Sequence, residues 1–139
     1  MRNNSIKKQL MVSGCFITFL LALLAAAEVT ANDDLVTCRY LKATGHDIQL
    51  QINVAAPPPA TIIVIQNIPA GITIKNSSPK INKLNNSKGR AKWLLKAIKP
   101  GSVLVEMSLD TPIKAGQLSG EIRYKNPATG MTVTMEIAP

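Results

Sequence analysis

The sequence predicts an all-β protein, built as an antiparallel β-sandwich of about seven strands. After residue 31, apolar and polar residues alternate with a period of two in most segments, as in strands with one buried and one solvated face. Clusters of proline, glycine and asparagine separate these segments at short intervals, which is typical of strands joined by turns. No segment after residue 31 has a convincing helical spacing of apolar residues.

The first three strands are predicted at residues 36–40, 48–54 and 61–65. In the first, Cys38 alternates with Val36 and Tyr40, so all three side chains are expected to point inward. The three prolines at residues 57–59 lack the backbone N–H that a ladder requires, and they end the second strand. Residues 61–65 are apolar on both faces. This predicts a central strand, or one covered on both sides.

Four further strands are predicted at residues 91–96, 102–109, 118–125 and 131–137. In the first of these, Trp93 is expected on the buried face, and Lys92 and Lys96 on the opposite one. Residues 69–71, 100–101 and 126–130 have turn chemistry, and residues 76–89 are expected to form the longest loop.

The N-terminal segment has the three parts of a secretory signal peptide. Basic residues 2, 7 and 8 precede a largely apolar run at residues 10–27, and small residues 29 and 31 flank a cleavage site before Asn32. Residues 25–27 offer a second site. The sequence thus predicts a signal peptide over residues 1–31 and a β-sandwich domain over residues 32–139. The alternatives are an uncleaved membrane anchor and a lipoprotein processed at Cys15.

Short motifs in the exported segment resemble those of a known group of domains. They are Asn-Ile-Pro-Ala-Gly at residues 67–71, Ala-Lys-Trp-Leu-Leu at 91–95, Lys-Pro-Gly-Ser at 99–102 and a glycine-containing strand at 116–125. In this order they resemble the immunoglobulin-like β-sandwich modules of prokaryotic cell-surface and secreted proteins. The resemblance implies a role in adhesion, scaffolding or assembly in the envelope or outside the cell. It implies no active site.

The sequence contains no convincing catalytic or metal-binding motif, so no enzyme, metal or cofactor is predicted. A blue-copper centre needs two histidines, whereas His46 is the one histidine in the chain. Cys38 and His46 form a conceivable nucleophile–base pair, but their spacing is weak evidence for one. A carboxylate pair for glycoside cleavage would have to come from the acidic residues of the later strands, which are Glu106, Asp110, Glu121 and Glu136.

Cys38 remains without an internal partner if residues 1–31 are removed, because Cys15 is the other cysteine. An odd cysteine in an exported chain indicates an intermolecular bridge or a reactive thiol. Its alternation with Val36 and Tyr40 favours instead a buried cysteine that packs as a small apolar side chain.

Charge is distributed unevenly along the chain. The whole sequence has a net charge of +8, and no Asp or Glu occurs from residue 48 to residue 105. The basic residues of that stretch form the predicted binding site: Lys75, Lys80, Lys83, Lys88, Arg90, Lys92, Lys96 and Lys99. A field of one sign attracts acidic partners. The alternative is a solvated surface whose lysines protect sheet edges from aggregation.

These observations lead to one main functional expectation. The chain is expected to be an exported, non-enzymatic sandwich that works as an adhesion, scaffold or assembly component, located in the periplasm or at the cell surface. Its partner would be an envelope or extracellular protein, or an acidic polymer. Specific nucleic-acid recognition is not expected, because Trp93 and Tyr124 point inward and leave no stacking platform. The alternative is a periplasmic or secreted binding protein for a polyanion or a small ligand.

Overall fold

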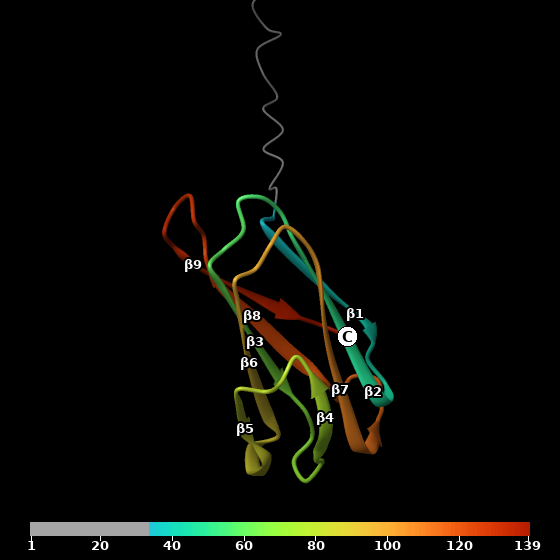
Figure 1. The fold of residues 1–139 in the computed structure, drawn as a ribbon. Coiled ribbons are helices and arrows are strands. Elements are labelled where there is room, and N and C mark those ends of the chain that lie inside the picture. Colours follow the sequence, from blue (N-terminus) through green and yellow to red (C-terminus); the bar gives the residue numbers. More distant parts are fainter. Residues whose placement is uncertain (1–33) are drawn as a thin grey trace, which may run out of the picture. The chain divides into compact units, whose positions relative to one another are not determined.

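The computed structural model describes residues 34–139, which fold into nine β-strands and one short 3-10 helix (Figure 1). The strands are β1 (Val36–Lys42), β2 (Gly45–Val54), β3 (Thr61–Asn67), β4 (Ile74–Ser78), β5 (Lys83–Asn85), β6 (Arg90–Lys96), β7 (Gly101–Ile113), β8 (Ser119–Lys125) and β9 (Thr132–Ile137). Helix η1 covers Asn86–Lys88. The predicted signal peptide, its cleavage sites and Cys15 lie outside the described residues. Within residues 34–139, no helix is long and apolar enough to cross a membrane.

The strands form two antiparallel sheets, as the period-two pattern predicts. The four-stranded sheet has the order β1-β2-β7-β4, and the five-stranded sheet has the order β5-β6-β3-β8-β9. In each sheet, strands that are distant in sequence lie side by side: β2 pairs with β7, and β3 pairs with β8. The fold is therefore held together by long-range pairing as well as by hairpins.

Both sheets contribute their inward-facing side chains to one aliphatic core. Alternate residues of β2, β3, β7 and β8 are buried, among them Ile52, Ile62, Val105 and Ile122. Trp93 of β6 is completely buried in the same cluster. Burial of apolar surface on both inner faces is the main stabilising term of a sandwich.

The hydrophobic strand predicted at residues 61–65 is central, as expected. It lies within β3, between β6 and β8. Its outward-facing Ile65 is only 5 % exposed and has Lys92 and Glu121 as its cross-strand neighbours. The long side chains of such neighbours can cover an apolar residue with their methylene groups while their charged ends reach water.

The segment predicted to be one long loop is more ordered than the sequence suggests. Residues 76–89 contain the end of β4, all of β5 and helix η1. The Asn85 side chain caps η1 by accepting a hydrogen bond from the Lys88 backbone N–H (3.1 Å). Gly89 then adopts a left-handed conformation that starts β6. These two short edge strands raise the count from the predicted seven to nine.

The period-two pattern of the strand predicted at residues 131–137 places Met131 on its inward face, and the structure differs there. The Met131 side chain is 68 % exposed, because β9 begins one residue later and Met131 belongs to the β8–β9 connection. Its backbone carbonyl closes that hairpin by accepting a hydrogen bond from the Asn126 N–H (2.8 Å).

A polar contact joins the two sheets inside the sandwich. Gln66 of β3 is 2 % exposed, and its Oε1 accepts a hydrogen bond from the Tyr40 hydroxyl of β1 at 2.6 Å. The Gln66 Nε2 has no hydrogen-bond partner among the described residues. Burial raises the pKa of Tyr40 to about 12; the bond to Gln66 acts in the opposite direction, and Cys38 adds a smaller upward contribution.

This pKa predicts a loss of stability at alkaline pH. An unfolded tyrosine ionises near pH 10, so stability from neutral Tyr40 is complete below about pH 10 and is lost as pH rises towards about 12. Absorbance of the phenolate during a pH titration should show a late tyrosine that Tyr40→Phe removes. Tyr124, whose pKa burial also raises, serves as the internal reference. Ionisation of both tyrosines near pH 10 would contradict the prediction.

Candidate binding surface

The outer face of the five-stranded sheet carries most of the basic side chains that the strands contribute. Strand alternation and register place six of them there: Lys83 on β5, Arg90, Lys92 and Lys96 on β6, and Arg123 and Lys125 on β8. These six residues are called the basic face below. The residues between them in sequence, such as Ala91 and Trp93, point into the core.

The structure brings together four of the eight basic residues predicted from sequence, namely Lys83, Arg90, Lys92 and Lys96. The other four lie on different elements. Lys75 is at a bulge in β4 of the four-stranded sheet, Lys80 precedes β5, Lys88 is in η1, and Lys99 is in the β6–β7 connection.

Arg123 and Lys125 join the basic face although the predicted site did not include them. The sequence predicts them on the solvated face of the strand at residues 118–125, because they alternate with Tyr124, which is expected to point inward. The sequence carried no signal, however, that β8 would lie next to β3, two strands away from β6.

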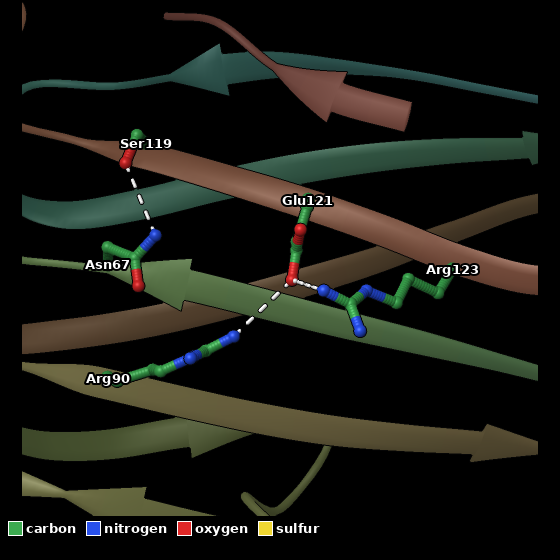
Figure 2. A network of polar contacts seen from close by, with 5 residues as sticks. All are labelled: Asn67, Arg90, Ser119, Glu121 and Arg123. Carbon is green, nitrogen blue, oxygen red and sulfur yellow. Dashed lines mark hydrogen bonds and ion pairs between the residues drawn. The ribbon is translucent and has the colours of Figure 1, made fainter. Parts of the chain in front are cut away.

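A carboxylate lies between the two arginines of the basic face. Glu121 Oε1 is 2.7 Å from Arg123 Nη2 and 3.4 Å from Arg90 Nη2, so one oxygen receives both guanidinium groups (Figure 2). Beside this group, Asn67 Nδ2 donates to Ser119 Oγ at 3.3 Å. Exposed ion pairs add little to stability. The contacts of Glu121 nevertheless orient the side chains of Arg90 on β6 and Arg123 on β8, the two strands on either side of β3.

Two lysines of the basic face directly oppose each other. Lys83 of β5 and Lys92 of β6 are register partners on the outer face, which places their Cβ atoms about 5 Å apart. Like charges in this position are destabilising. Within residues 34–139, neither ammonium group is in ion-pair distance of a carboxylate.

The four-stranded sheet is electrically balanced by comparison. Its strands carry three basic and three acidic residues, which are Arg39, Lys42, Lys75, Asp47, Glu106 and Asp110. Several are already paired on its surface: Lys42 Nζ is 3.8 Å from Asp47 Oδ2, and Glu106 Oε1 accepts a hydrogen bond from Gln49 Nε2 at 2.8 Å. The five-stranded sheet opposes its six basic residues with only Glu121 and Glu136.

The residues considered for metal binding and nucleophilic chemistry are dispersed. Cys38 pairs with Ile52, whereas His46 is six residues further back on β2, or about 20 Å along the strand. The His46 Nδ1 lies 3.1 Å from the Leu109 carbonyl oxygen. Over residues 34–139, no three side chains from His, Cys, Asp and Glu gather as metal ligands. The suggested Cys38–His46 pair is therefore not formed.

Cys38 packs against the core as a half-buried side chain, in agreement with the apolar role predicted for it. Burial raises the pKa of its thiol. This disfavours the thiolate, the form that reacts.

Of the acidic residues considered as a catalytic pair, the structure makes Glu121 and Glu136 direct cross-strand neighbours. Glu106 and Asp110 lie on β7 of the other sheet. Glu121 already accepts hydrogen bonds from two arginines. Its carboxylate therefore orients their guanidinium groups rather than serving as a proton donor.

Comparison with protein-family models, with curated proteins and with solved structures gave no match to this chain. The fold and the chemistry of its surface are therefore the basis for assigning a function.

Proposed function

We propose that this chain is an exported, non-enzymatic β-sandwich that serves as an adhesion, scaffold or assembly component in the periplasm or at the cell surface. In this proposal, the basic face is the surface that contacts an acidic partner. The observation that carries it is the charge difference between the two sheets: six basic residues against two acidic ones on the strands of one sheet, and three against three on the other. Such a one-sided field attracts anionic partners and orients their approach.

The strand order supports an immunoglobulin-like assignment. Constant-type immunoglobulin domains have strands A-B-E-D in one sheet and C-F-G in the other. The order β1-β2-β7-β4 corresponds to the first set, and β3-β8-β9 corresponds to the second. The β5–β6 hairpin is an addition between strands D and E that extends the second sheet beyond β3. Modules of this type commonly act by binding rather than by catalysis, an analogy at the level of the fold.

Export is supported by the three-part segment at residues 1–31. Native mass spectrometry of the protein purified from its own cells, with its N-terminal residue determined, tests this directly. We expect a chain that begins at Asn32 and is bound to itself or to another envelope component. A chain that begins at Met1 would contradict export with cleavage.

The contact surface can be tested with variants of equal net charge. Replacing Lys83, Lys92 and Lys96 by glutamine should release the protein from its envelope partner, because it removes three charges from the basic face. The control replaces Arg39, Lys42 and Lys114, which lie outside both the predicted site and the basic face, by glutamine and should leave association unchanged. Association is measured as the fraction of protein that sediments with envelopes or co-purifies with a partner. Equal association of both variants would exclude the basic face as the contact surface.

The alternative of a periplasmic or secreted protein that binds a polyanion or small ligand is favoured by the lysines of β5 and β6, which form no ion pair within the described residues 34–139. It predicts a monomer in native mass spectrometry and salt-dependent retention on an acidic polymer. The assembly role predicts a complex.

A further inference from the structure

Within residues 34–139, all four lysines of the basic face lie beyond ion-pair distance of any carboxylate, whereas both arginines are engaged by Glu121. Three of the four, Lys83, Lys92 and Lys96, lie on β5 and β6, at one margin of the five-stranded sheet, and Lys125 lies on β8. The repulsion between the opposed Lys83 and Lys92 would be relieved by an anionic group placed between them.

This margin of the sheet is held in place by backbone contacts rather than formed by a loose loop. The Asn82 backbone N–H donates to the Lys92 carbonyl at 2.9 Å, and the Asn82 Oδ1 accepts from the Leu94 N–H at 2.5 Å. The capped helix η1 fixes the far end of the β5–β6 hairpin. Because the backbones of β5 and β6 are fixed, the positions of the lysine Cα atoms are preorganised for a ligand.

The basic side chains of β6 form a linear track. Arg90, Lys92 and Lys96 all point outward, with spacings of about 7 Å and 13 Å at the rise of an extended strand. Lys83 flanks the middle of the track. On β3, the Thr61 hydroxyl lies beside Lys96 and the Asn67 amide beside Arg90, whereas Ile65 lies beside Lys92. The apolar pair Leu94 and Ile63 lies between Lys92 and Lys96 on the same face. A flexible polymer with repeated anionic groups and hydroxyls matches this pattern.

Other anionic macromolecules fit the basic face less well. Nucleic-acid strands are usually held by stacking on exposed aromatic rings, but Trp93 and Tyr124 are buried, and Tyr40 lies on the other sheet. Protein partners need apolar or aromatic anchors, and lipid surfaces favour side chains that insert. The exposed large apolar residues lie elsewhere. Leu41 and Leu104 belong to the four-stranded sheet, Met131 to a connection, and Leu84 is opposite inward-facing Ala91.

We infer that the β5–β6 hairpin is a binding site for a linear acidic polysaccharide, which lies along β6 with one sulfate or carboxylate group between Lys83 and Lys92. The inference rests on the proposed function, since it names the partner class of the same face. It adds that the position of the lysines, and not only their number, determines binding.

The test uses protein purified from its own cells, with dextran sulfate and alginate as sulfated and carboxylated probes and neutral dextran as the blank. The double variant Lys83→Gln/Lys92→Gln should bind the preferred probe at least about tenfold more weakly, because two charge-assisted contacts are lost. The control Arg39→Gln/Lys114→Gln has the same net charge and should bind within about threefold of the native protein. Unfolding in urea should show that both variants are folded.

Three results would overturn the inference. The first is equal weakening of both variants, and the second is binding of single-stranded DNA, polyglutamate or anionic vesicles as tight as that of the two polysaccharides. The third is absence of binding to either polysaccharide. In that case, continued sedimentation of the native protein with envelopes, lost on removal of Lys83, Lys92 and Lys96, would leave the proposed function standing. If the two double variants were weakened equally while the native protein still bound the polysaccharides, the basic face would remain a general anion-binding surface.

Discussion

Replacement of Trp93 by alanine is expected to have the largest effect of any single substitution in the described strands. Trp93 is completely buried, and removal of a buried aromatic side chain costs about 3–5 kcal/mol. Its indole N–H also bonds to the Pro79 carbonyl (2.9 Å) and to Ser77 Oγ (3.1 Å), which links β6 of one sheet to β4 of the other. Because small domains have only about 5–15 kcal/mol of stability in total, the variant should be close to unfolding.

Urea denaturation followed by circular dichroism measures this effect, since Trp93 is the one tryptophan in the chain and its loss removes the fluorescence signal. Trp93→Phe keeps an aromatic ring but removes the indole N–H from which Pro79 and Ser77 accept hydrogen bonds, and should cost about 1–3 kcal/mol. Ser77→Ala should cost less, because the Pro79 carbonyl still accepts the indole N–H. A loss below 1 kcal/mol for Trp93→Ala would contradict the central role given to this side chain.

The second large effect is expected at Gly120 of β8. A Cβ atom at this position would lie 2.7 Å from Gln66 Nε2 and 2.8 Å from the Ile65 carbonyl oxygen. The Gln66 amide cannot easily move away, since Tyr40 holds its other end, and the Ile65 carbonyl belongs to the central strand. Gly120→Ala should therefore destabilise the domain by about 3 kcal/mol, the upper range for overpacking.

Urea denaturation again provides the measurement, and a double variant separates the two contacts. Gly120→Ala combined with Gln66→Ala removes the contact with the Gln66 amide but retains the one with the Ile65 carbonyl oxygen. The second substitution should therefore recover only part of the stability that overpacking costs. Ser119→Ala, one residue away on the outer face, is the control and should change stability by less than about 0.5 kcal/mol. If Gly120→Ala were equally harmless, β3 and β8 could not be packed as closely as described.

The sequence was sufficient to predict the strands whose side chains alternate between core and solvent. It identified the buried face of Trp93 and the central position of residues 61–65, because burial leaves a clear pattern of apolar residues. It missed β4 and β5 as strands. β4 contains a bulge between Ile74 and Asn76 that interrupts the alternation, and all three residues of β5 are exposed. Backbone pairing, which leaves no trace in side-chain polarity, defines these two strands.

The candidate surface could be predicted only within a single strand. Alternation places Arg90, Lys92 and Lys96 on the same face of β6. The opposition of Lys83 to Lys92 depends on an edge strand that the sequence did not reveal. The addition of Arg123 depends on pairing between β3 and β8, which are separated by more than fifty residues. Register across such a distance is set by the three-dimensional packing of the whole sandwich.

The hydrogen bond between Tyr40 and Gln66 has a consequence for the uniqueness of the fold. Aliphatic side chains such as Ile52 and Ile62 can pack in several similar ways, so an aliphatic core tolerates small displacements of one sheet over the other. A hydroxyl and an amide oxygen 2.6 Å apart meet in one alignment, and any displacement would separate them and leave the buried Gln66 oxygen without this partner. We therefore expect this pair to select a single arrangement of β1 over β3, and to contribute more to structural uniformity than to the free energy of folding.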